Sequence, residues 1–445
     1  MTNTINAGII LAVLSLSASA AAQHGNNGSG SVDWTSYGGN AAGTRYSPLR
    51  QIDRSNVAKL QVAWTFDAAE GRGDGQTQPI VVKGVLYGIT PKHKIVALDG
   101  ASGKTLWTFD SGVAGRGPNR GLTYWSSGES GGDRLFTAVQ SFVYALNPAT
   151  GKPVESFGAG GRIDLRKDLG RDPSKISIVL TTPGILYKDL LIVGGRTPEA
   201  LPSPPGDIRA YDVRTGKLRW SFHTIPHPGE PGYETWPKDA WTHSGSANNW
   251  PGMAVDEKRG IVYAPTGSAA SDFYGFDRIG DNLYSNTLLA LDAATGKRLW
   301  HFQAVRHDIW DRDFPSPPTL VTVRRDGQQI EAVAQTTKQG SLYLFDRTDG
   351  RPLNPIEIRK FPASTVPGEI ASATQPLPVK PAPFSRAAVY FCRSALFIFF
   401  RCYFPAGNSS SRDFFKLSFA DVCPPSLHRF VFFRCGRVFR EHYQI

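Results

Sequence analysis

One pattern recurs five times along the chain and limits its fold more than any other feature. Its copies span residues 94–110, 142–158, 207–223, 287–303 and 341–357. In three copies an aspartate, a glycine and a tryptophan keep the same spacing, as in Asp99, Gly103 and Trp107, then Asp212, Gly216 and Trp220, then Asp292, Gly296 and Trp300. A pattern that returns every ~50 to 80 residues indicates repeated supersecondary units.

Each copy has the sequence of a β-hairpin. In the fourth, the alternating "TLLALD" predicts a half-buried strand, "ATGK" a turn whose glycine can take positive φ, and "RLWHFQ" the return strand. Apolar segments at 79–90, 182–195 and 260–267 predict another hairpin before three copies. Four antiparallel strands per unit, with a tryptophan to pack between neighbouring sheets, are typical of a β-propeller. We therefore predict an all-β propeller with about five such blades, the alternative being an irregular β-sandwich.

The composition agrees with this fold and argues against a nucleic-acid partner. The chain has 46 Gly, 32 Pro and 10 Trp but only 2 Met, which disfavours a helical protein. The net charge is +11, yet the Lys and Arg residues before Arg386 are not gathered into one run. We therefore expect no nucleic-acid binding.

The two ends differ from the repeated region. Residues 1–22 have a short apolar run followed by small residues, which predicts a secretory signal peptide and no transmembrane anchor. Residues 23–385 are predicted to form an incomplete propeller. Residues 386–445 contain 12 of the 25 Phe and all four Cys but no Trp. We interpret this segment as an aberrant, disordered tail, as an altered reading frame would produce; the alternative is a membrane-surface or partner-binding segment.

The stretch "RHDIWDRD" at 306–313 concentrates charge beside a tryptophan. A solvated loop tolerates such residues, but so does a site that holds a carboxylate against a cofactor. The main body has no cysteine, so a C-x-x-C-H haem attachment is excluded there and any redox chemistry needs another group.

The repeats, this loop and the opening segment 33–67 together resemble the quinoprotein dehydrogenases that use pyrroloquinoline quinone (PQQ) on an eight-bladed propeller. The resemblance covers about residues 33–386 and is nearest to the glucose/quinate-type branch. It implies that Asp311, in the W-D-x-D motif, is the general base that takes the substrate hydroxyl proton while hydride passes to the quinone. Lys338, 27 residues later, matches a lysine near the quinone oxygens, where it would stabilise developing negative charge.

The resemblance also implies residues that hold the cofactor. Arg120 in "NRGLTYW" would bind a PQQ carboxylate, Thr181 in "TTP" lies near the same groups, and Trp250 forms the floor beneath the planar rings. The family's adjacent cysteines or nearby histidine are missing, and Arg116 and Asn119 occupy that region instead.

A metal ion is implied as well, usually calcium and otherwise another divalent or lanthanide ion. Glu199 matches the ligand glutamate, while Ser268 stands where the family has an asparagine. Asp311 and Asp313 complete the expected oxygen ligands, which suit a hard cation acting as a Lewis acid.

The resulting hypothesis is a periplasmic PQQ-dependent dehydrogenase, free or peripheral to the inner membrane, that oxidises a sugar or an alcohol. Ubiquinone or a separate cytochrome would accept the electrons. The alternatives are a non-enzymatic propeller scaffold of the outer-membrane assembly type and an inactive, truncated quinoprotein. The sequence does not select among sugars and alcohols, metals or oligomeric states.

Overall fold

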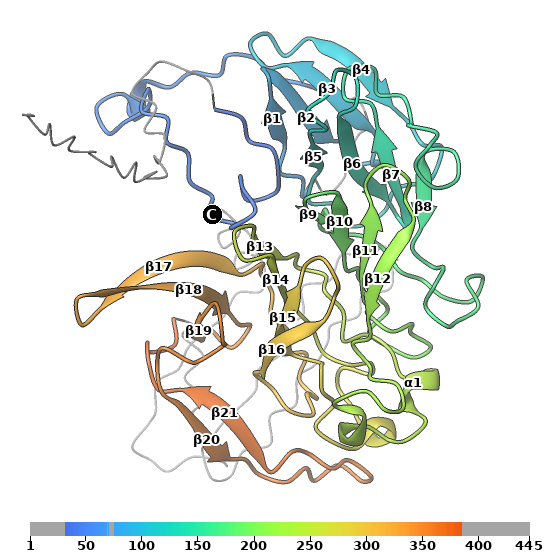
Figure 1. Ribbon diagram of the computed structural model, residues 1–445, viewed down its shortest axis with the longest axis vertical. Coiled ribbons are helices and arrows are strands. Elements are labelled where there is room, and N and C mark those ends of the chain that lie inside the picture. The colour runs from blue at the N-terminus through green and yellow to red at the C-terminus, as the bar shows by residue number, and fades with distance from the viewer. Residues whose placement is uncertain (1–31, 69, 71–74, 385–445) are drawn as a thin grey trace, which may run out of the picture. The chain divides into compact units, whose positions relative to one another are not determined.

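The repeated hairpins fold into antiparallel sheets whose strands follow one another in chain order (Figure 1). The computed structural model describes residues 32–68, 70 and 75–384, and the predictions for residues 1–22 and 386–445 lie outside this part. Within it, four sheets have four strands, one has three and one has two. The predicted all-β propeller with four-stranded blades is therefore confirmed, and we number the sheets as blades 1 to 6.

Blades 1 and 2 precede residue 165. Blade 1 comprises β1 (Ile80–Val82), β2 (Val85–Ile89), β3 (Ile95–Asp99) and β4 (Thr105–Phe109). Blade 2 comprises β5 (Thr123–Trp125), β6 (Arg134–Val139), β7 (Phe142–Leu146) and β8 (Arg162–Asp164).

Blades 3 and 4 are also complete. Blade 3 comprises β9 (Ile185–Tyr187), β10 (Leu190–Val193), β11 (Ile208–Asp212) and β12 (Leu218–Phe222). Blade 4 comprises β13 (Ala254–Asp256), β14 (Ile261–Pro265), β15 (Thr287–Asp292) and β16 (Arg298–Gln303).

The last two blades have fewer strands. Blade 5 comprises β17 (Thr319–Arg325), β18 (Gln328–Thr336) and β19 (Leu342–Asp346), and blade 6 comprises β20 (Ile356–Lys360) and β21 (Thr374–Pro378). The proline-rich sequence here predicts only an extended excursion, but β20 and β21 pair. Pro376 and Pro378 are tolerated because β21 has a single sheet neighbour and needs fewer donors.

Helices are short and few in the described residues. They are α1 (Ala240–His243) and three 3-10 turns, η1 (Val57–Lys59), η2 (Tyr233–Thr235) and η3 (Phe276–Arg278). Among the described residues, none of these helices has the length and hydrophobicity that crossing a bilayer requires.

The aspartate and glycine of the repeat close each hairpin, as predicted. In blade 4 the Asp292 carboxylate accepts hydrogen bonds from the backbone N–H groups of Ala294 and Thr295 at 3.0 and 2.8 Å. Gly296 has φ +74°, which a residue with a side chain rarely adopts, and its N–H donates to the Asp292 carbonyl. The turn is therefore specified by nearby residues.

The repeat tryptophans dock on the glycine of the next blade. A Cβ added to Gly151, Gly296 or Gly350 would lie only 2.4 to 2.6 Å from the nearest ring atom of Trp107, Trp220 or Trp300, respectively. Each indole N–H also donates to a turn carbonyl of that blade, those of Pro148, Ala293 and Arg347. Trp64 docks on Gly103 in the same way.

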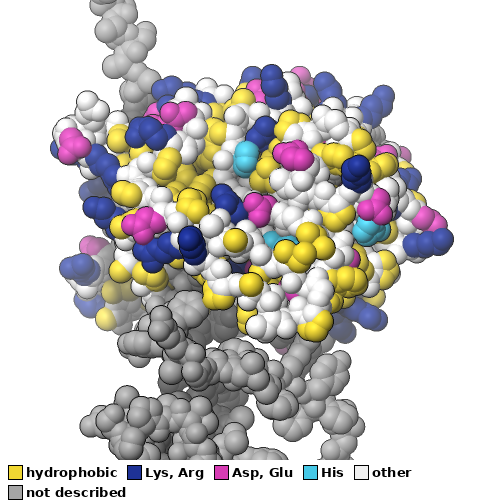
Figure 2. All heavy atoms as spheres, turned by 90° about the horizontal axis from the view of Figure 1, so that it is seen from below, with side chains coloured by type: hydrophobic (Ala, Val, Ile, Leu, Met, Phe, Trp, Pro, Cys, Tyr) yellow, Lys and Arg dark blue, Asp and Glu magenta, His cyan; other side chains and the backbone are white. Residues whose placement is uncertain are grey.

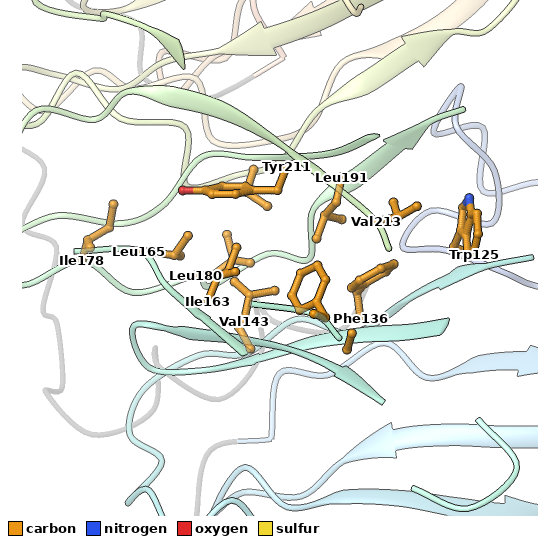
Figure 3. Close-up of a cluster of buried hydrophobic side chains, with 14 of the residues drawn as sticks. Trp125, Phe136, Val143, Ile163, Leu165, Ile178, Leu180, Leu191, Tyr211 and Val213 are labelled. Carbon is orange, nitrogen blue, oxygen red and sulfur yellow. The ribbon is translucent and has the colours of Figure 1, made fainter. Parts of the chain in front are cut away.

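Blade 2 has no tryptophan at this position. Phe157 packs on Phe136 with ring centroids 5.4 Å apart, and Gly158 donates its N–H to Thr215 in the turn of blade 3. Figure 3 shows the apolar side chains that fill the space between these blades, including Val143 from β7 and Leu191 from β10. Every complete blade thus buries one face against its neighbour.

The first strands of successive blades lie next to one another, with β5 in contact with β9, β9 with β13 and β13 with β17. The chain segments between blades therefore come together, as do the turns between second and third strands, because in an antiparallel sheet both lie at the same end of the strands. On the face shown in Figure 2, positive and negative side chains are interspersed.

Candidate functional site

The residues predicted for the site lie on these two kinds of connection. Arg120, Thr181, Trp250 and Asp313 precede β5, β9, β13 and β17, which are the first strands of blades 2 to 5. Lys338 lies in the turn between the second and third strands of blade 5. The propeller therefore brings together residues that are up to 218 positions apart in the sequence.

Lys338 joins the two aspartates of the W-D-x-D motif. Its Nζ lies 2.7 Å from Asp311 Oδ1 and 3.0 Å from Asp313 Oδ2. Asp311 has φ +51°, so the backbone here is in the left-handed region that few residues adopt. The spacing of 27 residues thus corresponds to a direct ion pair.

Asp313 is the buried centre of the site. Its Oδ2 accepts the indole N–H of Trp250 at 2.9 Å, and its Oδ1 accepts the backbone N–H of Ser268 at 2.6 Å. A Cβ on Gly267 would lie 2.5 Å from Oδ1, so this approach requires glycine. Asp313 consequently fixes Trp250 and Ser268 relative to Lys338.

Asp308 holds the loop that carries Asp311. Its carboxylate accepts the backbone N–H groups of Trp310 and Arg312, at 3.0 and 2.6 Å. The same carboxylate accepts the Ser268 hydroxyl at 2.5 Å and the Asn286 amide at 2.9 Å. Ser268, predicted as a metal ligand, therefore uses its hydroxyl on Asp308.

Arg120 and Thr181 contact Trp250 in different ways. The Arg120 guanidinium lies over the indole ring, 5.4 Å from its centroid. The buried Thr181 hydroxyl donates to the Trp250 carbonyl at 3.2 Å and does not line the cavity described next. Thr181 therefore supports the backbone of Trp250.

A cavity of about 250 Å³ lies among these side chains. It is lined by Pro118, Arg120, Arg196, Glu199, Ser246, Asn248, Trp250, Ser268, Asp272, Asp313 and Lys338. Arg196 and Asn248 lie three and two residues before the predicted Glu199 and Trp250, but they were not predicted themselves. Asp272 belongs to no motif, and sequence reasoning missed it.

Asp272 is an unusual carboxyl group. It is 5% exposed, and no described residue forms a hydrogen bond or ion pair with its side chain. Burial, together with the charges of Asp311, Asp313, Glu199 and Asp308, raises its pKa to about 8. A buried carboxyl without a partner leaves an acceptor in the cavity that a cation, a hydroxyl or a proton can satisfy.

The pKa of Asp311 is raised as well. Burial and the neighbouring Asp313 raise its pKa to about 6, although Lys338 opposes the shift. The two aspartates in turn raise the pKa of Lys338, because their attraction outweighs its burial. At neutral pH the site thus holds an ammonium group beside a moderately basic carboxylate.

The residues predicted to bind a metal are not arranged around one point. Glu199 is 65% exposed and pairs with Arg196 at 3.5 Å, while Asp311 and Asp313 face Lys338. In the described part of the chain, no group of three or more Asp, Glu, His or Cys side chains is placed to hold an ion. The protein side chains alone therefore do not chelate a cation in this arrangement.

The fold and this site define a β-propeller with a charged cavity among its inter-blade connections, and comparisons with known proteins assign its family. Residues 34–391 match the family model "Glucose/ethanol/alcohol dehydrogenase, beta-propeller domain". The chain therefore belongs to the family of PQQ-dependent quinoprotein dehydrogenases, as its resemblance predicted, and to the glucose/quinate branch within it.

Two curated relatives illustrate the similarity. Quinate/shikimate dehydrogenase (quinone) of Acinetobacter baylyi is 34% identical over 78% of this chain and 47% of its own length. Quinoprotein glucose dehydrogenase A of Acinetobacter calcoaceticus is 33% identical over 77% of this chain and 47% of its length. The chain spans about half the length of the curated relatives it matches.

The solved structures agree. Quinohemoprotein alcohol dehydrogenase from Comamonas testosteroni has a TM-score of 0.64 at 26% identity, covering 78% of this chain and 52% of that one. A europium-containing methanol dehydrogenase has a TM-score of 0.61 at 23% identity, covering 73% and 58%, and this supports the fold alone.

Proposed function

We propose that this chain binds PQQ in the cavity beside Trp250 and oxidises a hydroxyl group of a sugar or an alcohol. The observation that carries the proposal is the meeting of Trp250, Lys338 and Asp311 around Asp313 at the edge of a cavity. Relatives with the same fold are named as dehydrogenases of glucose, quinate or alcohols.

The cavity fits PQQ in chemical character. PQQ is a planar tricarboxylate, and the cavity offers one indole ring together with the cationic groups of Arg120, Arg196 and Lys338. A guanidinium group binds a carboxylate through two parallel hydrogen bonds, and an indole stacks on a planar ring system. Arg120, Trp250 and Lys338 would hold the cofactor, while Thr181 keeps Trp250 in place.

A hard cation fits the donor atoms but needs additional oxygens. The unpartnered Asp272 carboxyl supports a cation in this cavity, and Glu199, Ser268, Asp311 and Asp313 supply further oxygens nearby. Since these side chains do not converge on one point, the cofactor's own oxygens would have to complete the coordination. Calcium, another divalent ion or a lanthanide ion would satisfy this chemistry.

Asp311 is the proposed general base. Its raised pKa of about 6 leaves it ionised at neutral pH and more basic than an exposed aspartate. It would accept the proton of the substrate hydroxyl. The ammonium group of Lys338 keeps the carboxylate oriented, and it lies where negative charge would develop on an adjacent acceptor. When bound, PQQ accepts the hydride and the cation polarises the receiving carbonyl.

The location and the electron acceptor are part of the proposal. We propose export to the periplasm, and ubiquinone or a separate cytochrome as the acceptor. The apolar run at the amino terminus supports export, and residues 23–385 contain no cysteine for a C-x-x-C-H haem attachment.

Absorbance titration of the 445-residue chain with PQQ and Ca²⁺ tests the proposal. We expect saturable binding by the wild-type chain, by Asp311→Asn and by the control Asp326→Asn, whose residue lies in the exposed β17–β18 turn. With sugars, quinate and primary alcohols and an artificial electron acceptor, Asp311→Asn should lose turnover by about 100-fold or more. Absence of PQQ binding by the wild-type chain would overturn the proposal and favour a scaffold or an inactive propeller.

A further inference from the structure

A buried histidine–glutamate pair lies behind the loop that carries Asp311. His307 Nε2 is 2.6 Å from Glu369 Oε1, and both side chains are only 1% exposed. His307 belongs to the loop between β16 and β17, whereas Glu369 belongs to the segment between β20 and β21. The two residues are 62 positions apart, and neither is used in the proposed reaction.

The hydrogen bonds of this pair place a proton on His307 Nδ1 and give both Glu369 oxygens a partner. His307 Nδ1 lies 2.8 Å from the Gly280 carbonyl, which can only accept, so Nδ1 carries a proton. Burial raises the pKa of Glu369, but the hydrogen bonds from the Gly275 N–H and from His307 outweigh it, and the pKa is lowered. His307 Nε2 and the Gly275 N–H thus contact the two oxygens of the Glu369 carboxyl group, Oε1 and Oε2, in a buried position.

The pair connects three segments of the chain. Besides the loop of His307 and the segment of Glu369, it includes residues 266–286, because Gly275 donates to Glu369 Oε2 at 2.6 Å and Gly280 accepts from His307. That third segment carries both Ser268 and Asp272. The His307–Glu369 pair therefore connects the loop that carries Asp311 to the segment that carries Ser268 and Asp272.

Further contacts attach blade 6 to the same loops. The backbone N–H of Arg306 donates to the Gln375 side-chain oxygen at 2.8 Å. The Gln375 side-chain nitrogen donates to the Arg306 carbonyl at 2.7 Å. The Tyr274 hydroxyl donates to the Pro367 carbonyl at 2.6 Å. The β20–β21 hairpin is therefore joined to the loop at Arg306, the residue preceding His307.

The step from His307 to Asp311 is short. His307 has φ +46° and is followed directly by Asp308, whose carboxylate binds the N–H groups on both sides of Asp311. Rotation of His307 would therefore displace Asp308 and the peptide groups that orient Asp311. We infer that His307 and Glu369 are positioning residues, through which the β20–β21 hairpin sets the orientation of the Asp311 loop.

Charged groups of the neighbouring segments contact the same loop. Arg278 is fully buried and donates to the Asp308 carbonyl at 2.6 Å. The Asp281 carbonyl accepts the backbone N–H of His307 at 3.1 Å, and the Asp281 carboxylate lies 3.9 Å from Arg306. These contacts also tie residues 278–281 to the loop that carries Asp311.

The experiment uses the full chain and needs no cofactor. A result that contradicts this inference can therefore be distinguished from a failure to bind PQQ. Nitrogen-15 NMR of the wild-type chain at pH 7 should show a proton on His307 Nδ1, assigned by the signals lost in His307→Gln. Amide hydrogen exchange then reports the loop itself. We expect Glu369→Gln to lower the protection factors of the Trp310 and Arg312 amides at least tenfold.

Glu357→Gln is the matched control, because Glu357 lies on the same hairpin but is exposed and pairs with Arg359 at the surface. This variant should leave both protection factors unchanged. The protection factor of the Trp220 amide should stay unchanged in every variant.

Two outcomes would overturn the inference. One is a His307 ring without a proton on Nδ1 at pH 7 in the wild type. The other is equal protection of the Trp310 and Arg312 amides in the wild type and Glu369→Gln. The wild-type measurement decides the first question even if a variant fails to fold.

Discussion

Two tryptophans illustrate how differently this chain uses one residue type. Trp220 lies between blades 3 and 4, with its ring on Gly296 and its N–H donated to the Ala293 carbonyl at 3.2 Å. Trp250 lies in the cavity, where its N–H binds the Asp313 carboxylate and cationic groups lie over its ring. The first environment is apolar and recurs at Trp107 and Trp300, whereas the second is charged. The comparison separates the contacts that stabilise the propeller from those available for chemistry.

The largest effect is expected at the blade interface. Trp220→Ala should lower the free energy of unfolding by about 3 to 5 kcal/mol, since it removes a buried ring and leaves a cavity. Chemical denaturation at pH 6 and pH 9 measures it, and the loss should be equal at both values because the contact is apolar. A strongly pH-dependent loss would contradict the distinction between the two environments.

The next effect belongs to the cavity and depends on pH. The pKa of Asp272 is raised to about 8 in the folded chain, against about 3.9 when unfolded, so between these values the folded state binds the additional proton. Stability from this group is therefore present at low pH and lost as pH rises toward 8. The free energy of unfolding of Asp272→Asn, relative to that of the wild type, should therefore rise by about 2 to 4 kcal/mol from pH 5 to pH 9.

The control for this pH effect is Asp326→Asn, at an exposed turn position with φ +48° that asparagine also tolerates. Its unfolding free energy should follow that of the wild type at every pH. If Asp272→Asn also follows the wild type, then Asp272 has a partner that neutralises its charge in the folded state.

A smaller loss is expected when the docking glycine changes. Gly296→Ala places a Cβ 2.5 Å from the Trp220 ring at a residue with φ +74°, and should cost about 2 to 3 kcal/mol. Gly327→Ala is the control, because Gly327 has φ +77° but nothing within 4 Å of the new Cβ, so about 1 kcal/mol is expected. Equal losses from the two variants would show that ring contact adds nothing to backbone strain.

The smallest change in stability is expected at Trp250. Trp250→Phe keeps an aromatic ring but removes the N–H that binds Asp313, which also accepts from Ser268 and Lys338. The free energy of unfolding should fall by about 1 kcal/mol. PQQ affinity, measured by absorbance titration, should fall more than stability does, whereas Trp220→Phe should show the reverse.

The sequence predicted the repeated elements well because their interactions are local. Asp292 binds peptide groups two and three residues away, and Gly296 closes the same turn. The same kind of reasoning was wrong about blade 6, since pairing of a proline-containing strand depends on whether it has one or two neighbours. The predicted cofactor contact of Thr181 stays a prediction; in the structure its hydroxyl donates to the Trp250 carbonyl.

For the candidate site, motif positions identified Asp311, Asp313, Lys338, Arg120 and Trp250, which the fold brings together. Asp272 and Glu369 carry no comparable signal. An aspartate in "SDFYG" and a glutamate in "PGEIA" look like ordinary loop residues. Their importance depends on burial, on nearby charges and on hydrogen bonds from segments up to 94 residues away.

The sequence by itself therefore determined the hairpins, the docking tryptophans and the family. These features depend on short-range hydrogen bonds and on side-chain spacing between residues that are close together in the sequence. Only the tertiary structure decided which carboxylates are paired, which one is left without a partner, and which segment supports the Asp311 loop. The physical reason is that desolvation and Coulomb interactions depend on distance in space, and the propeller places inter-blade segments together that the chain keeps far apart.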